Sequence, residues 1–395
     1  MKKKYCIILA LGFCLAPMLI ITGCDIRIGN WGQAKYERTV QQQTYLASGS
    51  TLVAETSFGS VTITGADVTD CNVVAKICGR APTEQGAQEL AEQVKIKLEV
   101  VDDTLTVKAE KPPEERKRSI SVSYNITVPR QTNIKCSSSY GEIDLTDING
   151  SVDGRTSSGS ISAENIEGPV ILNTSYGSVK CRDISGDNVT IKSSSGSITA
   201  ENIKGSAQLD TSYGSITCEN MSDGDLKLQT SSGKIRITNA SFGDCDAHTS
   251  YGSILSNELK GDSIKLHSGS GGVKVTEAVS DTADVSTSYG RITCRQITTN
   301  DLTVKSGSGD LDIACSDSTP AEIAANLVTS YGSIDFVAPP DFSGKIDLST
   351  SYGSIRTNRP ITISGEISNK KIKGTIGEGK GMLYLKTSSG SINLK

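Results

Sequence analysis

A glycine recurs through most of this chain at intervals of 18 or 19 residues, and this repeat limits the possible folds more than any other feature. Each glycine lies in a short phrase of the form Thr/Ser-Ser-Tyr/Ser-Gly-Ser-Ile/Val. A fixed period of this kind is typical of a solenoid, in which neighbouring coils bury each other's apolar faces. The regular copies centre on Gly141, Gly159, Gly177, Gly196, Gly214, Gly233, Gly252, Gly271, Gly290 and Gly309, and looser copies follow at Gly332, Gly353 and Gly390.

Apolar residues alternate within each unit on both sides of the glycine. Val170 and Leu172 precede Gly177 at odd offsets, whereas Val179 and Cys181 follow it at even offsets. A period of two indicates β-strands, and the change of parity predicts a bend at the glycine. We therefore expect an all-β fold, a β-solenoid similar to a parallel β-helix, over residues 131–395.

The residue before the glycine alternates between tyrosine and serine from one unit to the next. Because like side chains stack on like in β-ladders, this alternation favours coils of two units, which would place Tyr213 about 5 Å from Tyr251. Tyr331 and Tyr352 depart from the rhythm, so the last coils are expected to be irregular and to cap the stack. The regular tyrosines form either a ligand-facing surface, for example for sugars, or a structural ladder; they are Tyr140, Tyr176, Tyr213, Tyr251 and Tyr289.

The first 24 residues have the features of an export signal. Three lysines follow Met1, an apolar stretch extends to Ile21, and Ile21-Thr22-Gly23-Cys24 ends the segment. This order is typical of a secretory signal peptide. The segment resembles a bacterial lipoprotein signal, and the resemblance implies cleavage after residue 23 and lipid on Cys24. An ordinary signal peptide with a chance cysteine is the alternative. We expect residues 1–23 to be the signal and residues 24–44 to be a lipidated tether.

Residues 45–130 are expected to form a separate β-rich region with one helix. Thr83 is a suitable helix cap, and the apolar residues between Pro82 and Val94 share one helical face. Alternating segments on both sides of Asp102-Asp103 predict a hairpin. Residues 120–128 are expected to form another strand, and residues 56–61 already resemble the repeat.

The chain resembles a known family in several of these segments. The residues that carry the resemblance are Tyr124 to Pro129, Ser139 to Ile143 and the following Gly-Ser-Ile series. Together they are similar to the bacterial "putative-adhesin" β-repeat family, a domain of unknown function in envelope proteins. The resemblance implies an exported or membrane-tethered β-solenoid without established catalysis.

Eight cysteines follow Cys24, and three of them share one place in the repeat. Cys181, Cys218 and Cys294 each lie four residues after a glycine, where other units have Ala, Leu, Ile or Val. They are therefore expected to be buried thiols that act as small core residues. Cys71 and Cys78 remain the candidate disulfide pair, since export permits disulfides.

Several classes of chemistry have little support in this sequence. The two histidines, His248 and His267, are too few for a multi-histidine metal site, and the cysteine spacings match no zinc pattern. No serine lies in a Gly-x-Ser-x-Gly elbow. A net charge of −4, or −7 once the three signal lysines are removed, gives no general reason to bind nucleic acid. We expect no catalytic residues, no metal and no cofactor.

These observations predict a membrane-anchored, non-enzymatic lipoprotein of the bacterial cell envelope, facing the periplasm or the exterior. It would act as a binding, adhesin-like or structural solenoid. Its partners would be the membrane, through the lipid, and an envelope polysaccharide or another envelope protein. One alternative is an accessory protein of an envelope-stress signalling system. Another is a carbohydrate-active β-helix enzyme, which would need carboxylates that converge in a cleft outside the solenoid.

Overall fold

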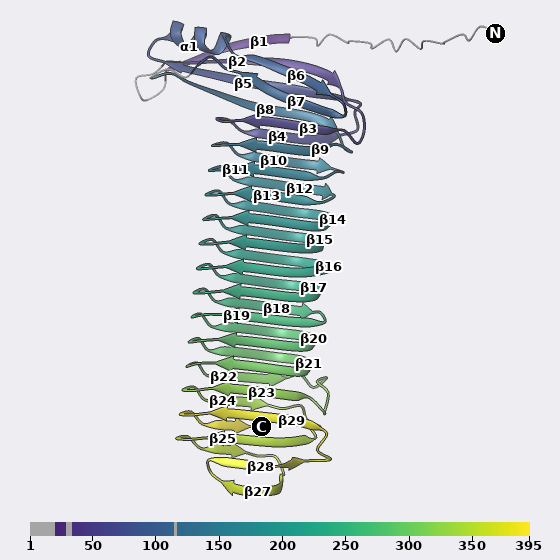
Figure 1. The fold of residues 1–395 in the computed structure, drawn as a ribbon, viewed down its shortest axis with the longest axis vertical. Coiled ribbons are helices and arrows are strands. Elements are labelled where there is room, and N and C mark those ends of the chain that lie inside the picture. Colours follow the sequence, from purple (N-terminus) through teal and green to yellow (C-terminus); the bar gives the residue numbers. More distant parts are fainter. Residues whose placement is uncertain (1–19, 29–33, 114–116) are drawn as a thin grey trace, which may run out of the picture.

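The structure is a computed structural model that describes residues 20–28, 34–113 and 117–395. It consists of a small cap at the N-terminal end and a long stack of coils that continues to the C-terminal end (Figure 1). Most of the described backbone is β-strand, and the described residues contain one α-helix of nine residues. Within the described residues, no helix is long and apolar enough to cross a membrane.

The cap is an antiparallel sheet with one helix on it. Its strands are β1 (Ile20–Ile28), β2 (Ala34–Tyr45), β5 (Asp70–Ala81) and β8 (Ser119–Pro129), paired in that order. Helix α1 (Glu84–Glu92) begins after Thr83, whose side chain accepts a hydrogen bond from the Gly86 N–H. The hairpin of β6 (Lys95–Val101) and β7 (Thr104–Glu110) follows. The predicted helix, hairpin and strand are thus confirmed.

The expected tether over residues 24–44 is wrong in its second half. Residues 34–45 form β2, in which Ala34, Tyr36 and Val40 are buried in the cap core. Most residues of β2 are polar, so the sequence lacks the regular alternation of apolar and polar residues that would predict a strand here. Pairing with β1 and β5 on either side stabilises it instead.

The first coil of the solenoid comes from residues N-terminal to the expected repeat domain. Strands β3 (Thr51–Thr56) and β4 (Val61–Ala66) pair in parallel with the next coil below them. On their other side they pair in parallel with β7 and β8 of the cap. The cap and the solenoid therefore share one continuous network of strand pairs.

Each repeat unit forms one complete coil. Val179 pairs with Ile198, and Ile198 pairs with Ile216, so the chain returns to the same place after 18 or 19 residues. The strands involved are β9 (Asn133–Ser138), β10 (Ile143–Ile148), β11 (Val152–Thr156), β12 (Ile161–Glu167), β13 (Val170–Thr174), β14 (Val179–Ser193), β15 (Ile198–Thr211), β16 (Ile216–Thr230), β17 (Ile235–Thr249), β18 (Ile254–Lys260), β19 (Ser263–Ser268), β20 (Val273–Thr287), β21 (Ile292–Ser306) and β22 (Leu311–Cys315).

The predicted coil of two units is therefore wrong. Ser232 lies on the coil between those of Tyr213 and Tyr251, because the Ser232 N–H donates to Ser212 O and the Tyr251 N–H donates to Ser231 O. Tyrosines of successive odd coils are then two strand spacings apart, about 9.6 Å. The stacking rule fails here because it applies to side chains that pack on one another, and these tyrosines face solvent.

The core lies inside the coils and follows the predicted alternation. Val170, Leu172, Val179 and Cys181 are all at most 1% exposed, on both sides of Gly177. Each fully buried Val, Leu or Ile side chain contributes about 1.5–3 kcal/mol through removal of apolar surface from water. The inward change of parity at the glycine is confirmed by the burial pattern.

The last coil in the chain is not the last coil in space. Strand β29 (Gly381–Thr387) inserts between β23 (Ala324–Thr329) and β25 (Gly344–Thr350), parallel to both. Likewise β30 (Ile392–Leu394) inserts between β24 (Ile334–Val337) and β26 (Ile355–Thr357). The hairpin of β27 (Thr362–Ser368) and β28 (Lys371–Ile376) pairs antiparallel with β25 and closes the stack (Figure 1). The expected irregular C-terminal cap is confirmed.

Candidate functional site

A hydroxyl group joins each glycine turn to the turn of the neighbouring coil. The Thr230 hydroxyl accepts a hydrogen bond from the Gly233 N–H at 3.1 Å and donates one to Gly214 O at 3.0 Å. Thr230 is 1% exposed. The same pair of bonds is formed by Ser138, Thr156, Thr174, Ser193, Thr211, Thr249, Thr287, Ser306, Thr329, Thr350 and Thr387.

Close approach between coils explains why the turn residue is glycine. A Cβ on Gly233 would lie 1.8 Å from Gly214 O, and the other stacked turn glycines are equally crowded. No positive φ is involved at this position, so the requirement is space and not left-handed backbone. The hydroxyl and the glycine, three residues apart, together hold the turn in one shape on every coil.

This rigid turn projects the residue before the glycine into solvent. We call seven such residues the tyrosine file: Tyr140, Tyr176, Tyr213, Tyr251, Tyr289, Tyr331 and Tyr352. Their side chains are between 63% and 83% exposed. The sequence predicted the first five as candidates. Tyr331 and Tyr352 join them because the spatial order of the coils differs from the order along the chain.

The alternation of tyrosine and serine is regular in space even where it is irregular in sequence. The inserted C-terminal coil carries Ser389 at the turn, and Gly390 stacks between Gly332 and Gly353. Ser389 therefore separates Tyr331 from Tyr352, as Ser232 separates Tyr213 from Tyr251. Duplication of a two-coil segment would reproduce the alternation along the chain only. The alternation in space therefore extends across the inserted coil.

At one end of the tyrosine file, an aromatic ring from the adjacent coil stacks on a tyrosine. Phe58 lies at the turn of the first coil, and its ring is parallel to that of Tyr140, with an interplanar angle of 3° and centroids 4.9 Å apart. The two parallel rings are therefore stacked with an offset. A face of the Tyr140 ring is turned toward the neighbouring coil.

The turn edge is almost uncharged. In the coils from Tyr140 to Tyr352, the two residues before each turn glycine and the one after it are nearly all Ser, Tyr or Gly. Four charges occur at these positions, on Glu142, Lys234, Arg291 and Asp310, and the last two are 2.6 Å apart as an ion pair. Tyrosine, serine and glycine also dominate the binding loops of antibodies, where tyrosine gives large contact area at low entropic cost.

The opposite bend of the coil has a different polar ladder. Asn202, Asn220 and Asn239 have positive φ, between 51° and 55°, and their side-chain amides donate to the Asp or Asn of the preceding coil at 2.7–2.8 Å. Asparagine tolerates this conformation better than other residues with a Cβ. This ladder was not predicted from the sequence, although Asn or Asp recurs six residues after the glycine from Asp147 to Asn239.

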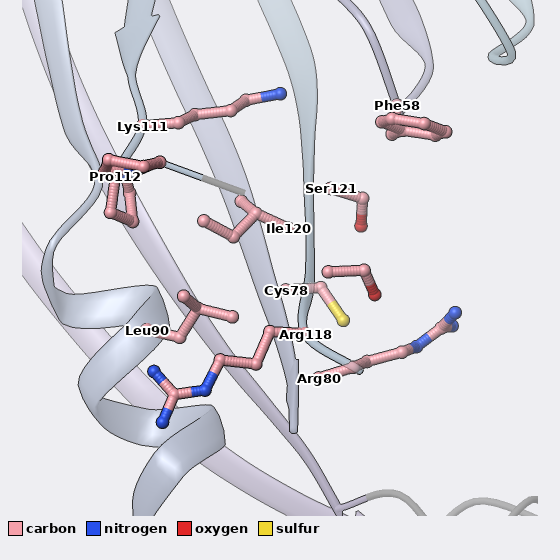
Figure 2. A pocket seen from close by; sticks show the side chains of 11 residues that line it. Phe58, Cys78, Arg80, Leu90, Lys111, Pro112, Arg118, Ile120 and Ser121 are labelled. Carbon is pink, nitrogen blue, oxygen red and sulfur yellow. The ribbon is translucent and has the colours of Figure 1, made fainter. Parts of the chain in front are cut away.

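A pocket of about 320 Å³ lies in the cap, beside helix α1. Phe58, Leu90 and Ile120 give it apolar walls, and Arg80 and Arg118 place positive charge at it (Figure 2). Phe58 thus borders both this pocket and the end of the tyrosine file.

The core cysteines are buried free thiols. Cys181, Cys218 and Cys294 are free and at most 1% exposed, as predicted. Burial raises the pKa of Cys181 to about 12. Cys71 and Cys78 are also free, at two places along the single strand β5, so the candidate disulfide between them is wrong.

The two histidines lie on adjacent coils. The rings of His248 and His267 stack with centroids 4.9 Å apart, and burial, followed by the nearby His248, lowers the pKa of His267. Within the part of the chain that the structure describes, no group of His, Cys, Asp or Glu is arranged to hold a metal ion.

The expected signal peptide lies largely outside the described residues. Residues 1–19 are not described, and the backbone of Cys24 falls within β1. Lipidation of Cys24 thus stays a prediction from the sequence.

The solved structures that match this chain have low sequence identity to it and low TM-scores. A protein of Clostridium sporogenes named "putative cell adhesion protein" has 12% identity and a TM-score of 0.19, over 90% of this chain and 98% of that one. A "putative adhesin" of Parabacteroides merdae has 12% identity and a TM-score of 0.29, over 70% and 95%. Another from Bacteroides fragilis has 13% identity and a TM-score of 0.25, over 70% and 96%.

A family model covers nearly the whole solenoid. The model described as Toastrack DUF4097 matches residues 52–244 and again residues 223–395, so its two matches begin at the first coil and end at the C-terminal residue. No curated protein matches the chain. The resemblance inferred from the repeat is confirmed, and this β-solenoid chain belongs to the Toastrack DUF4097 family.

Proposed function

We propose that this protein is an adhesin-like binding module of the bacterial envelope, and that the tyrosine file is its binding surface. The observation that carries the proposal is the straight file of seven exposed tyrosines, alternating with serines in space. A regular array of exposed aromatic residues promotes association with other molecules, as exposed apolar patches generally do. Their retention on every second coil supports a role in binding.

The shape of the protein suits binding to an extended or repetitive partner. The stacked coils make a rod about 60 Å long at ~4.8 Å per coil. Every second coil presents the same group, so weak individual contacts would add up along the rod. Outward carboxylates are in several cases paired with a base on a neighbouring coil, as in Arg182–Glu201 and Arg295–Asp312. Such pairing suits a binding surface better than a catalytic one.

A lipid on Cys24 would hold this module at a membrane. Cys24 lies in β1, which pairs antiparallel with β2 of the cap. A lipid on this residue would therefore be attached directly to the cap sheet. The cap would then remain close to the membrane while the rod extends away from it. Replacement of Cys24 by serine should release the protein from the membrane fraction and abolish labelling by a clickable fatty acid, and persistent labelling would refute the anchor.

Retention of protein-coated beads on envelope fragments tests the binding role. Beads carrying the wild-type chain should bind envelopes of the bacterium that produces it. Beads carrying a variant with all seven tyrosines of the file changed to serine should not. Tyr45→Ser is the matched control, because Tyr45 is 62% exposed and lies in the cap, outside the file. Equal retention of the wild type and the seven-site variant would overturn the proposal.

A further inference from the structure

We infer that the partner of the tyrosine file is a second copy of this chain, in antiparallel orientation, with the tyrosines of each copy inserted between those of the other. The inference rests on the proposed binding function and names its partner. Five features of the structure lead to it: the space between tyrosines, the direction of the rings, the period, the symmetry and the charge.

The gap at each serine coil has room for one aromatic ring. Phe58 already occupies the coil next to Tyr140, with the two ring centroids 4.9 Å apart. Aromatic pairs at separations of 4.5–7 Å attract each other. Between two tyrosines of the file the equivalent place holds an exposed serine, for example Ser232. A ring from outside that entered there would lie about 4.8 Å from a tyrosine on either side.

The direction of the rings determines which partners fit. A face of the Tyr140 ring is turned toward the neighbouring coil, and the other tyrosines occupy the same place in the same repeated turn. A linear polysaccharide that lay along the edge would meet the rims of these rings, because its sugar rings run along its own chain. A side chain that projects across the gap meets the ring faces instead. The geometry thus favours a partner with projecting flat groups.

A second copy supplies such groups at the required period without any mismatch. Its tyrosines are also two coils apart, and a shift of one coil brings each tyrosine opposite a serine. The tyrosines of one copy therefore fit the serine positions of an identical second copy. This complementarity depends on the order of the coils in space, which explains why Ser389 on the inserted coil keeps Tyr331 and Tyr352 apart.

Symmetry selects the antiparallel orientation. A closed dimer with its two-fold axis along the rod would place tyrosine opposite tyrosine at every level. A two-fold axis across the rod, between the coils of Tyr251 and Ser270, places tyrosine opposite serine throughout. In this register Tyr176, Tyr213, Tyr251, Tyr289, Tyr331 and Tyr352 of one copy face Ser389, Ser308, Ser270, Ser232, Ser195 and Ser158 of the other. The two caps then point in opposite directions, as pairing between two facing membranes requires.

Charge and contact area are compatible with this pairing. The four charges on the turn edge sum to zero, so the negative charge of the whole chain does not act across the contact at short range. Twelve inserted tyrosines would bury on the order of 1,000 Å², near the lower limit for specific association. We therefore expect a reversible dimer that multiple copies on a surface would strengthen.

Sedimentation of the purified full chain, with Cys24→Ser to exclude lipid, tests the inference directly. The wild-type surface should give a concentration-dependent dimer. Filling three gaps with Ser195→Tyr, Ser232→Tyr and Ser270→Tyr should abolish it, although this variant has more exposed aromatic rings than the wild type. Tyr45→Ser should dimerise normally. Should the filled variant fail to fold, Tyr251→Ser with Tyr289→Ser should weaken dimerisation by tenfold or more.

Photo-oxidative cross-linking tests the register. The antiparallel register predicts dityrosine links between Tyr176 and Tyr331 or Tyr352, which lie many coils apart within one chain. Links restricted to Tyr213–Tyr251 and similar neighbours would contradict it, as would a wild-type protein that remains monomeric. Envelopes from a strain that lacks this chain separate the two proposals. Tyrosine-dependent retention on those envelopes, or on a polysaccharide, would overturn the second-copy inference and leave the proposed function standing. Retention that never depends on the tyrosines overturns both.

Discussion

The glycine turn and the asparagine bend of each coil differ in whether their outward side chains interact within the protein. At the asparagine bend, side chains such as Asn220 bond both to the coil before and to the coil after. At the glycine turn, the backbone and the buried hydroxyl are fully bonded, but the tyrosine beside them projects away. The asparagine side chains form hydrogen bonds with one another, whereas the tyrosine side chains of the file are exposed to solvent. The comparison separates the stabilising residues of a repeat from those available for binding.

The largest effect is expected from Gly233→Ala. The added Cβ would lie 1.8 Å from Gly214 O, and backbone atoms on both coils would have to move. We expect a loss of about 4 kcal/mol or more, or local opening of the stack. Urea denaturation followed by circular dichroism would measure it. Ser232→Ala, one residue earlier and exposed, is the control and should change little; equal effects of the two would refute the crowding argument.

A smaller loss is expected from Thr230→Val, which has nearly the same shape. It removes the hydroxyl that bonds Gly214 O and the Gly233 N–H, and leaves both groups buried without this partner. Unfolding should become easier by about 2 kcal/mol. Thr230→Ser keeps the hydroxyl, as Ser193 does naturally, and should recover most of the stability. A valine variant as stable as the wild type would show that the hydroxyl is dispensable.

At the other bend, Asn220→Ala should cost about 1–2 kcal/mol. The substitution removes two side-chain hydrogen bonds and places alanine at a φ of 55°. Asn220→Gly separates the two causes, because glycine adopts positive φ without strain but restores no hydrogen bond. Thermal denaturation should rank the wild type first, glycine second and alanine third. The reverse order of glycine and alanine would mean that strain at positive φ costs alanine less than the greater freedom of the unfolded chain costs glycine.

These energies also explain which parts of the fold the sequence could predict. The inward alternation around Gly177 and the amphipathic helix after Thr83 are local patterns, and both are confirmed. The predicted coil size was wrong because the stacking rule applies to packed side chains, and these tyrosines are exposed; the hydroxyl three residues before each glycine joins coils of one unit each. Strand β2 and the inserted β29 depend on pairing with distant segments, which no local pattern records.

The arrangement of the tyrosine file in space differs from the order of its residues along the chain. Along the sequence, Tyr331 and Tyr352 break the rhythm of the tyrosines, and they were therefore assigned to an irregular end. In space the inserted coil restores the alternation. The candidate residues could be predicted from the sequence, but the full extent of the file could not. The full extent of the file depends on the insertion of β29 and β30 between two coils that precede them in the sequence.

The smallest effect on stability is expected from Tyr251→Ser, and it is the sharpest test of the contrast between the bends. Tyr251 is 71% exposed, and among the described residues of the file only Tyr140 stacks on another ring. The free energy of unfolding should change by less than about 0.5 kcal/mol. The same variant should weaken self-association in sedimentation, because it empties the position beside the two-fold axis. Asn220→Ala should behave oppositely, with lower stability and unchanged association. A tyrosine variant that lost stability without losing association would place the tyrosine file among the structural ladders, together with the asparagines.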